Sequence, residues 1–185
     1  MTPPWEHRLA AGIALVVALF LVHVAWAQPP TVHGLVGSSD HDVLAQMCFG
    51  ETGTHERACA AQVHIMVRRA ELRGMTVGRM ARIYSQPLRG ASRRAWVRGL
   101  TTHGRRPAGF PERASWSATQ ARFRALHAFV GDVLTGAEPD PCPEALHFAG
   151  PAWLDGDAPT GFEPCCEDVH ERQRMFCRVP AGGAS

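Results

Sequence analysis

The stretch from Cys48 to Arg69, CFGETGTHERACAAQVHIMVRR, decides the fold because it joins two apolar segments of helical spacing through one short polar turn. Glu51 lies at that junction. Burial at such a junction disfavours the charged form of a carboxyl group and raises its pKa, as a general acid working near neutral pH requires. Glu51 is therefore the first candidate functional residue. The alternative is that Glu51 caps the second helix, whose N-terminus favours an acidic side chain.

Apolar spacing and capping residues predict five helices. Ser38, Ser39 and Asp40 offer caps for the first, which should stop near Gly50. The others are expected from about Glu56 to Leu72, from Thr76 to the breaker Pro87, from Ala91 to Leu100, and from Ser115 to Gly136. The last has the most regular apolar stripe and is expected to organise the core.

The chain beyond Ala137 is rich in Pro, Gly and Cys and has no long periodic segment. It predicts a disulfide-tied, loop-rich tail with at most a hairpin or a short helix near Asp168 to Arg174. The fold class expected is mainly α, α+β at most, in a single domain.

Residues 1–27 have the layout of a cleavable signal peptide: Arg8, an apolar run from Leu9 to Val24, and small residues before Gln28. The alternative is an uncleaved membrane anchor. Residues 28–40 read as a lead-in linker. Either way, we expect the rest of the chain to be exported, periplasmic or secreted, and to meet a membrane only through its N-terminal segment.

All six cysteines follow the export segment, where an oxidising compartment favours disulfides. The candidates are Cys48, Cys59, Cys142, Cys165, Cys166 and Cys177. Cys48 and Cys59 flank Glu51 and could close that loop. Cys142 could pair with Cys165, Cys166 or Cys177, and the sequence does not choose among these.

Two other uses of the cysteines stay open. Zinc could be held by Cys165, Cys166, Cys177 and His170, although adjacent cysteines lack the usual ligand spacing and disulfides are the default. A cysteine peptidase could use Cys48 or Cys59 as nucleophile and His64 or His147 as base, but an even number of cysteines in an exported chain disfavours a free thiol. We therefore expect no metal.

All 19 basic residues are Arg, and they cluster between Arg68 and Arg124 in a chain of formal net charge +2. This bias suits an anionic polymer such as a cell wall, and nucleic acid would suit it too. It is equally typical of a solvated surface.

A series of motifs occurs in a recognisable order: LAQMCFGETG, a helix ending in VRR, YSQP, a long helix, and DPCPEALHFAGPAW. This order resembles the catalytic domain of the SleB-like, spore-cortex-lytic cell wall hydrolases and the related lysozyme-like lytic transglycosylases. The resemblance covers Asp42 to Trp153. Arg68 replaces a family Asn, and Glu56 lies one residue beyond the place of a second family Glu.

The resemblance implies a lysozyme-like catalytic domain over residues 41–155, with residues 156–185 as a Cys-rich tail packed on it. It implies that Glu51 is the catalytic acid in cleavage of peptidoglycan between N-acetylmuramic acid and N-acetylglucosamine, without a cofactor. Substrate-binding roles are implied for Tyr84, Gln86, His147 and Phe148, and a packing role for Trp153. The expected partner is the glycan strand and not nucleic acid, and the expected state is a monomer.

A single carboxylate fits a lytic transglycosylase, in which the 6-hydroxyl of muramic acid attacks in place of water. The alternative is a muramidase-type hydrolase, whose second carboxylate would be Glu56, Asp155 or Asp157. A non-catalytic wall-binding module is the alternative from another class, and Glu51 would be dispensable in it.

Overall fold

The structure is a computed structural model that describes residues 38–89, 92, 94–149, 160–166, 169 and 173–179. The predicted export segment 1–27 and most of the lead-in linker lie outside the described residues. The same holds for Trp153, Asp155, Asp157 and His170, so their predicted roles stay predictions. Within the described ranges, none of the helices combines the length and the apolar character needed to span a bilayer.

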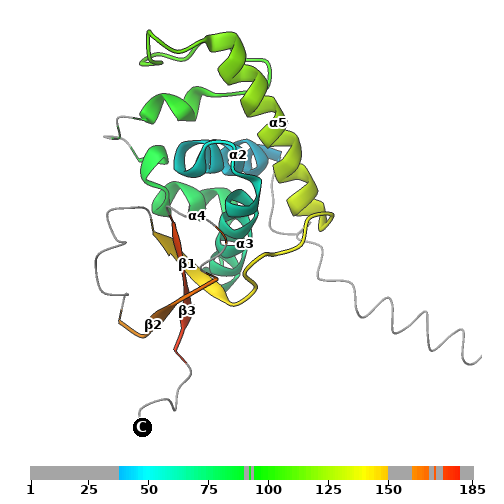
Figure 1. Ribbon diagram of the computed structural model, residues 1–185, viewed down its shortest axis with the longest axis vertical. Helices are drawn as coiled ribbons and strands as arrows, with labels where there is room; N and C mark the ends of the chain where they lie inside the picture. The colour runs from blue at the N-terminus through cyan, green and yellow to red at the C-terminus, as the bar shows by residue number, and fades with distance from the viewer. Residues whose placement is uncertain are drawn as a thin grey trace, which may run out of the picture. The chain divides into compact units, whose positions relative to one another are not determined.

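The described part is mainly helical, as predicted (Figure 1). Its helices are α2 (Ser38–Thr52), α3 (Glu56–Arg73), α4 (Val77–Tyr84) and α5 (Trp116–Thr135), with 3₁₀ turns η2 (Gln86–Leu88) and η3 (Ala95–Gly99). The second and the long helices are confirmed to within a residue or two, and the third, predicted between Thr76 and the breaker Pro87, ends at Tyr84. The helix predicted for Ala91 to Leu100 is wrong, because its described part holds only the five-residue turn η3.

The helix ends follow from their capping residues. His55 accepts a hydrogen bond from the backbone N–H of Ala58 at the start of α3, and Ser115 does the same for Ala118 at the start of α5. Gly74 and Gly136 end these two helices with φ of 58° and 79°, a left-handed conformation that favours glycine.

Helix α2 lies in the centre of the helical part, in contact with α3, α4 and α5 (Figure 1). Residues Val43–Cys48 are all buried, so this helix has no solvent face in that stretch. A helix enclosed on all sides does not need an amphipathic stripe. The close approach of α4 requires Gly78, because a Cβ there would lie 2.1 Å from Oδ1 of Asp40.

The C-terminal part contains a three-stranded antiparallel sheet, which corrects the expectation of at most one hairpin or a short helix. The strands are β1 (Ala145–Ala149), β2 (Phe162–Cys165) and β3 (Arg174–Arg178), in the order β1-β3-β2. β1 packs on α3 (Figure 1). Residue 174 begins a strand, because Arg174 pairs with Ala149 in β1. The strands are short and their partners lie far apart in the sequence, so no local spacing signals them.

Three disulfides join the cysteines in pairs: Cys48 with Cys59, Cys142 with Cys166, and Cys165 with Cys177. The bridge around Glu51 is confirmed, and Cys166 is the partner of Cys142 among the three considered. Such bridges are typical of an oxidising compartment.

Candidate active site

Glu51 occupies the last turn of α2, one residue before the helix ends at Thr52. Gly53, with φ of 69°, then turns the chain toward α3. The Cys48–Cys59 disulfide holds the end of α2 against the first turns of α3, with the two Cα atoms 5.1 Å apart. Glu51 therefore lies at a junction that is covalently closed on one side, in the place that the sequence predicts.

The carboxylate of Glu51 accepts two hydrogen bonds from the segment after α4. Ser85 Oγ donates to Oε1 at 3.0 Å, and the backbone N–H of Gln86 donates to the same oxygen at 3.1 Å. Ser85 is buried and Gln86 is exposed. Because both donors contact Oε1, Oε2 is the oxygen left for proton transfer to a ligand.

The pKa of Glu51 is raised above its ordinary value of 4.5 because burial disfavours the charged form. The hydrogen bonds from Ser85 and Gln86 act in the opposite direction, and so do the positive charges of Arg94 and Arg89. Burial is the largest of these effects, so the proton is held more tightly than in water. This is the direction that a general acid needs.

Gly50 brings this arrangement together. A Cβ at position 50 would lie 2.5 Å from Cβ of Pro87, so only glycine lets η2 approach the end of α2. Arg94 adds a second tie, since its Nη1 donates to the carbonyl of Gly50 at 2.5 Å. The two donors to Glu51 are thus positioned by direct contact between α2 and η2.

Arg69 connects the predicted site residues Tyr84 and His147. Its guanidinium carbon lies 3.5 Å from the centre of the Tyr84 ring, and Nη1 donates to the carbonyl of Leu146 at 2.9 Å. The same nitrogen lies 2.5 Å from Nδ1 of His147. The His147 ring also meets the edge of Phe162, with centroids 4.4 Å apart. Tyr84 directly precedes Ser85 in the sequence.

The pKa of His147 is lowered from 6.5 to about 4, by burial first and then by the charges of Arg69 and Arg73. The imidazole is therefore neutral at neutral pH. Nη1 of Arg69 lies 2.5 Å from Nδ1 and 3.2 Å from Nε2 of His147. Because an arginine can only donate, one of these ring nitrogens is the acceptor, and the other carries the proton of the neutral ring. His147 can then donate a hydrogen bond to a ligand hydroxyl or carbonyl.

Phe148 is separated from this cluster and contacts the hydrophobic core. The pairing of β1 with β3 shifts between Ala145 and His147, which brings Ala145 and Phe148 to the core side although they are three residues apart. The substrate-binding role that the resemblance implies for Phe148 stays a prediction. The structure gives this side chain a packing contact.

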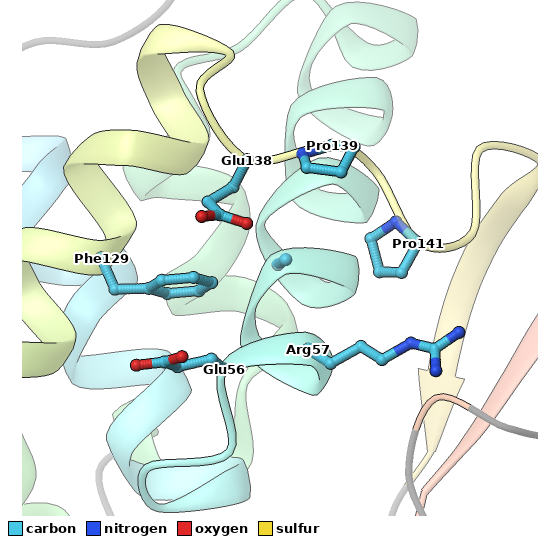
Figure 2. Close-up of a pocket in the computed structure, with 7 residues that line it drawn as sticks. Glu56, Arg57, Phe129, Glu138, Pro139 and Pro141 are labelled. Carbon is cyan, nitrogen blue, oxygen red and sulfur yellow. The ribbon is translucent and has the colours of Figure 1, made fainter.

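Glu56, a candidate second carboxylate, lies in different surroundings from Glu51. It is exposed in the first turn of α3 and lines a shallow pocket of about 440 Å³ with Phe129, Glu138, Pro139 and Pro141 (Figure 2). The groups that act on Glu51 come instead from residues 85–94.

Arg68 fixes the segment before β1. It pairs with Asp140 and donates to the carbonyls of Cys142 at 3.0 Å and Ala145 at 2.7 Å. Arg68 and Arg69, adjacent in sequence, thus hold neighbouring parts of one segment to α3.

All six cysteine sulfurs are bonded to one another in this structure. A thiolate nucleophile at Cys48 or Cys59 is therefore not available in the oxidised protein, and the same bonds occupy the sulfurs considered as zinc ligands. His64, the other peptidase candidate, lies 4.0 Å from Asp140, and burial lowers its pKa.

Sequence reasoning missed four residues that shape the site: Arg69, Ser85, Arg89 and Arg94. Ser85 lies inside the YSQP motif, and Arg69 ends the VRR motif. Both motifs therefore pointed to the site, but the predicted roles were given to the neighbouring residues. Arg89 and Arg94 carried no signal beyond the general abundance of Arg.

Comparison of the chain with protein-family models, with curated proteins and with solved structures returned no match in any of the three. The function must therefore be argued from the residues of the site.

Proposed function

We propose that this protein cleaves the glycan strand of peptidoglycan between N-acetylmuramic acid and N-acetylglucosamine, as a lytic transglycosylase with Glu51 as its catalytic acid and base. The observation that carries the proposal is the environment of Glu51. It is a partly buried carboxyl group of raised pKa whose Oε1 is fixed by Ser85 and Gln86 at the end of α2.

In the proposed reaction, protonated Glu51 gives its proton to the bridging oxygen as the bond from that oxygen to C1 of the muramic acid breaks. The 6-hydroxyl of the same sugar then attacks C1, and the Glu51 carboxylate takes up the hydroxyl proton. The products are a 1,6-anhydro end and a free 4-hydroxyl on the departing sugar. Glu51 returns to its starting state without consuming water.

Two features favour one carboxylate over two. Among the residues that the structure describes, the charged groups that act on Glu51 are arginines, whereas hydrolysis with two carboxyl groups needs the second within roughly 5–9.5 Å. Glu56 lines a pocket formed by other residues and is not among the groups that shift the pKa of Glu51. The neutral His147 and the exposed Gln86 supply hydrogen-bonding groups near the same segment for the sugar ring. The proposed setting, following from the disulfides and the predicted export segment, is the periplasm or the exterior of the cell.

The test is loss of turbidity of purified peptidoglycan with the wild type, Glu51→Gln and the matched control Glu56→Gln. We expect Glu51→Gln to lose roughly 100-fold or more of the rate, the usual contribution of a general acid, and Glu56→Gln to keep it. Mass spectrometry of the released fragments should show anhydro ends.

Equal clearing by the wild type and Glu51→Gln would reject the catalytic role. Reducing ends together with inactivity of Glu56→Gln would identify the muramidase alternative, and clearing by none of the proteins would favour the wall-binding module. Because burial raises the pKa of Glu51, the charged form is disfavoured in the fold, and Glu51→Gln should not lower the melting temperature at neutral pH.

A further inference from the structure

We propose that Arg89 and Arg94 bind a carboxylate carried by the substrate strand beside Glu51, so that the site selects an anionic glycan. The inference rests on the proposed function and names the chemistry that its site prefers. It starts from two exposed arginines that are fixed by the backbone around Glu51.

Arg94 is tied to the residue before Glu51, since its Nη1 donates to the carbonyl of Gly50 at 2.5 Å. The carbonyl lies in the last turn of α2, where the helix dipole favours a cation. The side chain is nevertheless exposed. An arginine has five N–H donors in a planar fork, so one bond to Gly50 orients the guanidinium and leaves donors for a ligand.

Arg89 is fixed by the segment that supplies the donors to Glu51. Its Nε donates to the carbonyl of Ile83 at 2.9 Å, and its backbone N–H donates to the carbonyl of Gln86 at 3.1 Å. Gln86 is the residue whose own N–H binds Glu51. Arg89 is also exposed; it follows η2, and its side chain donates to a carbonyl at the C-terminal end of α4. Both guanidiniums are therefore positioned by the elements that form the site.

The reaction itself gives a reason for an anionic ligand. Breaking the glycosidic bond develops positive charge at the sugar ring, and two guanidiniums nearby would oppose it if they stayed unneutralised. A carboxylate on the substrate would remove this opposition on binding. Arginine is suited to the task because its fork binds a carboxylate through two parallel hydrogen bonds.

Peptidoglycan carries carboxylates of two kinds, on the lactyl groups of strands without peptides and on the stem peptides. The experiment compares three tetrasaccharides of alternating N-acetylglucosamine and N-acetylmuramic acid: one with free lactyl carboxylates, one with these converted to primary amides, and one bearing stem peptides. Binding is measured by calorimetry in the Glu51→Gln background, which prevents turnover. The variants are the pair Arg89→Gln and Arg94→Gln, and as control the pair Arg122→Gln and Arg124→Gln, exposed on α5 and not among the groups that act on Glu51.

We expect at least one carboxylate-bearing ligand to bind roughly tenfold to 100-fold more tightly than the amide form, the range of charge-assisted hydrogen bonds. This preference should disappear in the Arg89 and Arg94 double variant, persist in the control, and shrink in 1 M salt, where the screening length is about 3 Å. Preference for the free lactyl ligand, or for the peptide-bearing one alone, identifies the source of the carboxylate.

Equal affinity for all three ligands would overturn the proposal. So would an equal loss for all three in the Arg89 and Arg94 double variant, because that pattern indicates a structural role. The proposed function fails separately: if Glu51→Gln clears peptidoglycan as well as the wild type does, cleavage by Glu51 is rejected while the ratio of affinities still stands.

Discussion

At the scale of the residue, Glu51 combines two opposing influences. Burial raises its pKa, whereas hydrogen bonds from Ser85 and Gln86 and the charges of Arg94 and Arg89 lower it. The net result is a raised pKa. The carboxyl group itself is held in place by hydrogen-bond donors that favour its charged form. A group in this balance can give up a proton and take one back, as a single-carboxylate mechanism requires.

Replacing Ser85 with alanine tests this balance. The hydroxyl stabilises the charged form of Glu51, so its removal raises the pKa further. The free enzyme must carry a protonated Glu51, and activity therefore falls as the pH rises through that pKa. We expect the alkaline limb of the kcat/KM profile to move to higher pH in Ser85→Ala.

Profiles of the wild type, Ser85→Ala and the control Ser117→Ala on solubilised glycan strands would measure the shift. Ser117 is exposed on α5. An alkaline limb that stays in place or moves to lower pH would contradict the role of Ser85, and a shift in Ser117→Ala would show that the effect is not local.

At the scale of the element, the close contact between α2 and η2 is what gives Glu51 its partners. Gly50 and Pro87 touch at a distance that excludes a Cβ. The YSQP motif that follows α4 is thereby pressed against the end of α2, and its Ser85 and Gln86 meet the carboxylate. The site is thus formed where two elements meet, and neither element holds it alone.

Gly50→Ala should separate these elements. Alanine improves helix propensity by about 1 kcal/mol, but overpacking against Pro87 typically costs about 1–3 kcal/mol, so we expect a lower free energy of unfolding in urea. Because Ser85 and Gln86 move with η2, activity should fall roughly 10-fold to 100-fold, the scale of a 1 Å misplacement.

Gly131→Ala in α5 is the matched control, because its added Cβ would meet only the side chain of His41, at 3.3 Å, and no backbone atom. It should be neutral or stabilising and keep full activity. Wild-type stability and activity in Gly50→Ala would show that η2 can shift without affecting Glu51.

At the scale of the whole described domain, α3 connects the helical part to the sheet. Gln62, fully buried, donates to Oε1 of Gln173 just before β3 at 2.6 Å, and Arg68 and Arg69 donate to carbonyls at the start of β1. Three short strands would be marginal by themselves. The sheet carries His147, so its attachment to α3 decides whether that residue keeps its contact with Arg69.

Removal of the Cys142–Cys166 bridge tests this attachment. The bridge links residues 24 apart in the sequence. Its loss increases the conformational entropy of the unfolded chain and lowers the free energy of unfolding by about 2–4 kcal/mol. We expect the double variant Cys142→Ala, Cys166→Ala to show this loss in urea unfolding. The resonance of His147 should shift, because its contact with Arg69 weakens.

The control is the pH profile of activity in the same variant, because this profile reports on the surroundings of Glu51. It should stay as in the wild type, since the Cys48–Cys59 bridge is intact. An unchanged free energy of unfolding would contradict the structural importance of the bridge. A changed alkaline limb would show that the sheet also shapes the surroundings of Glu51.

Local features of the sequence determine much of the helical framework. His55, Thr76 and Ser115 cap the helices they precede, and Gly74 and Gly136 end theirs, because capping depends on residues three or four positions apart. The position of Glu51 at a helix junction and its enclosure by Cys48 and Cys59 follow from the same local spacing.

The tertiary structure decided which distant groups meet. Ser85 reaches Glu51 across 34 positions, and Arg69 reaches His147 across 78. The partner of Cys142, the packing of Phe148 and the three-stranded sheet also depend on such encounters. Local propensity does not predict these contacts, because they depend on the packing of α2, α3 and the strands. The same packing buries an acidic residue at the end of a helix and so raises the pKa of its carboxyl group.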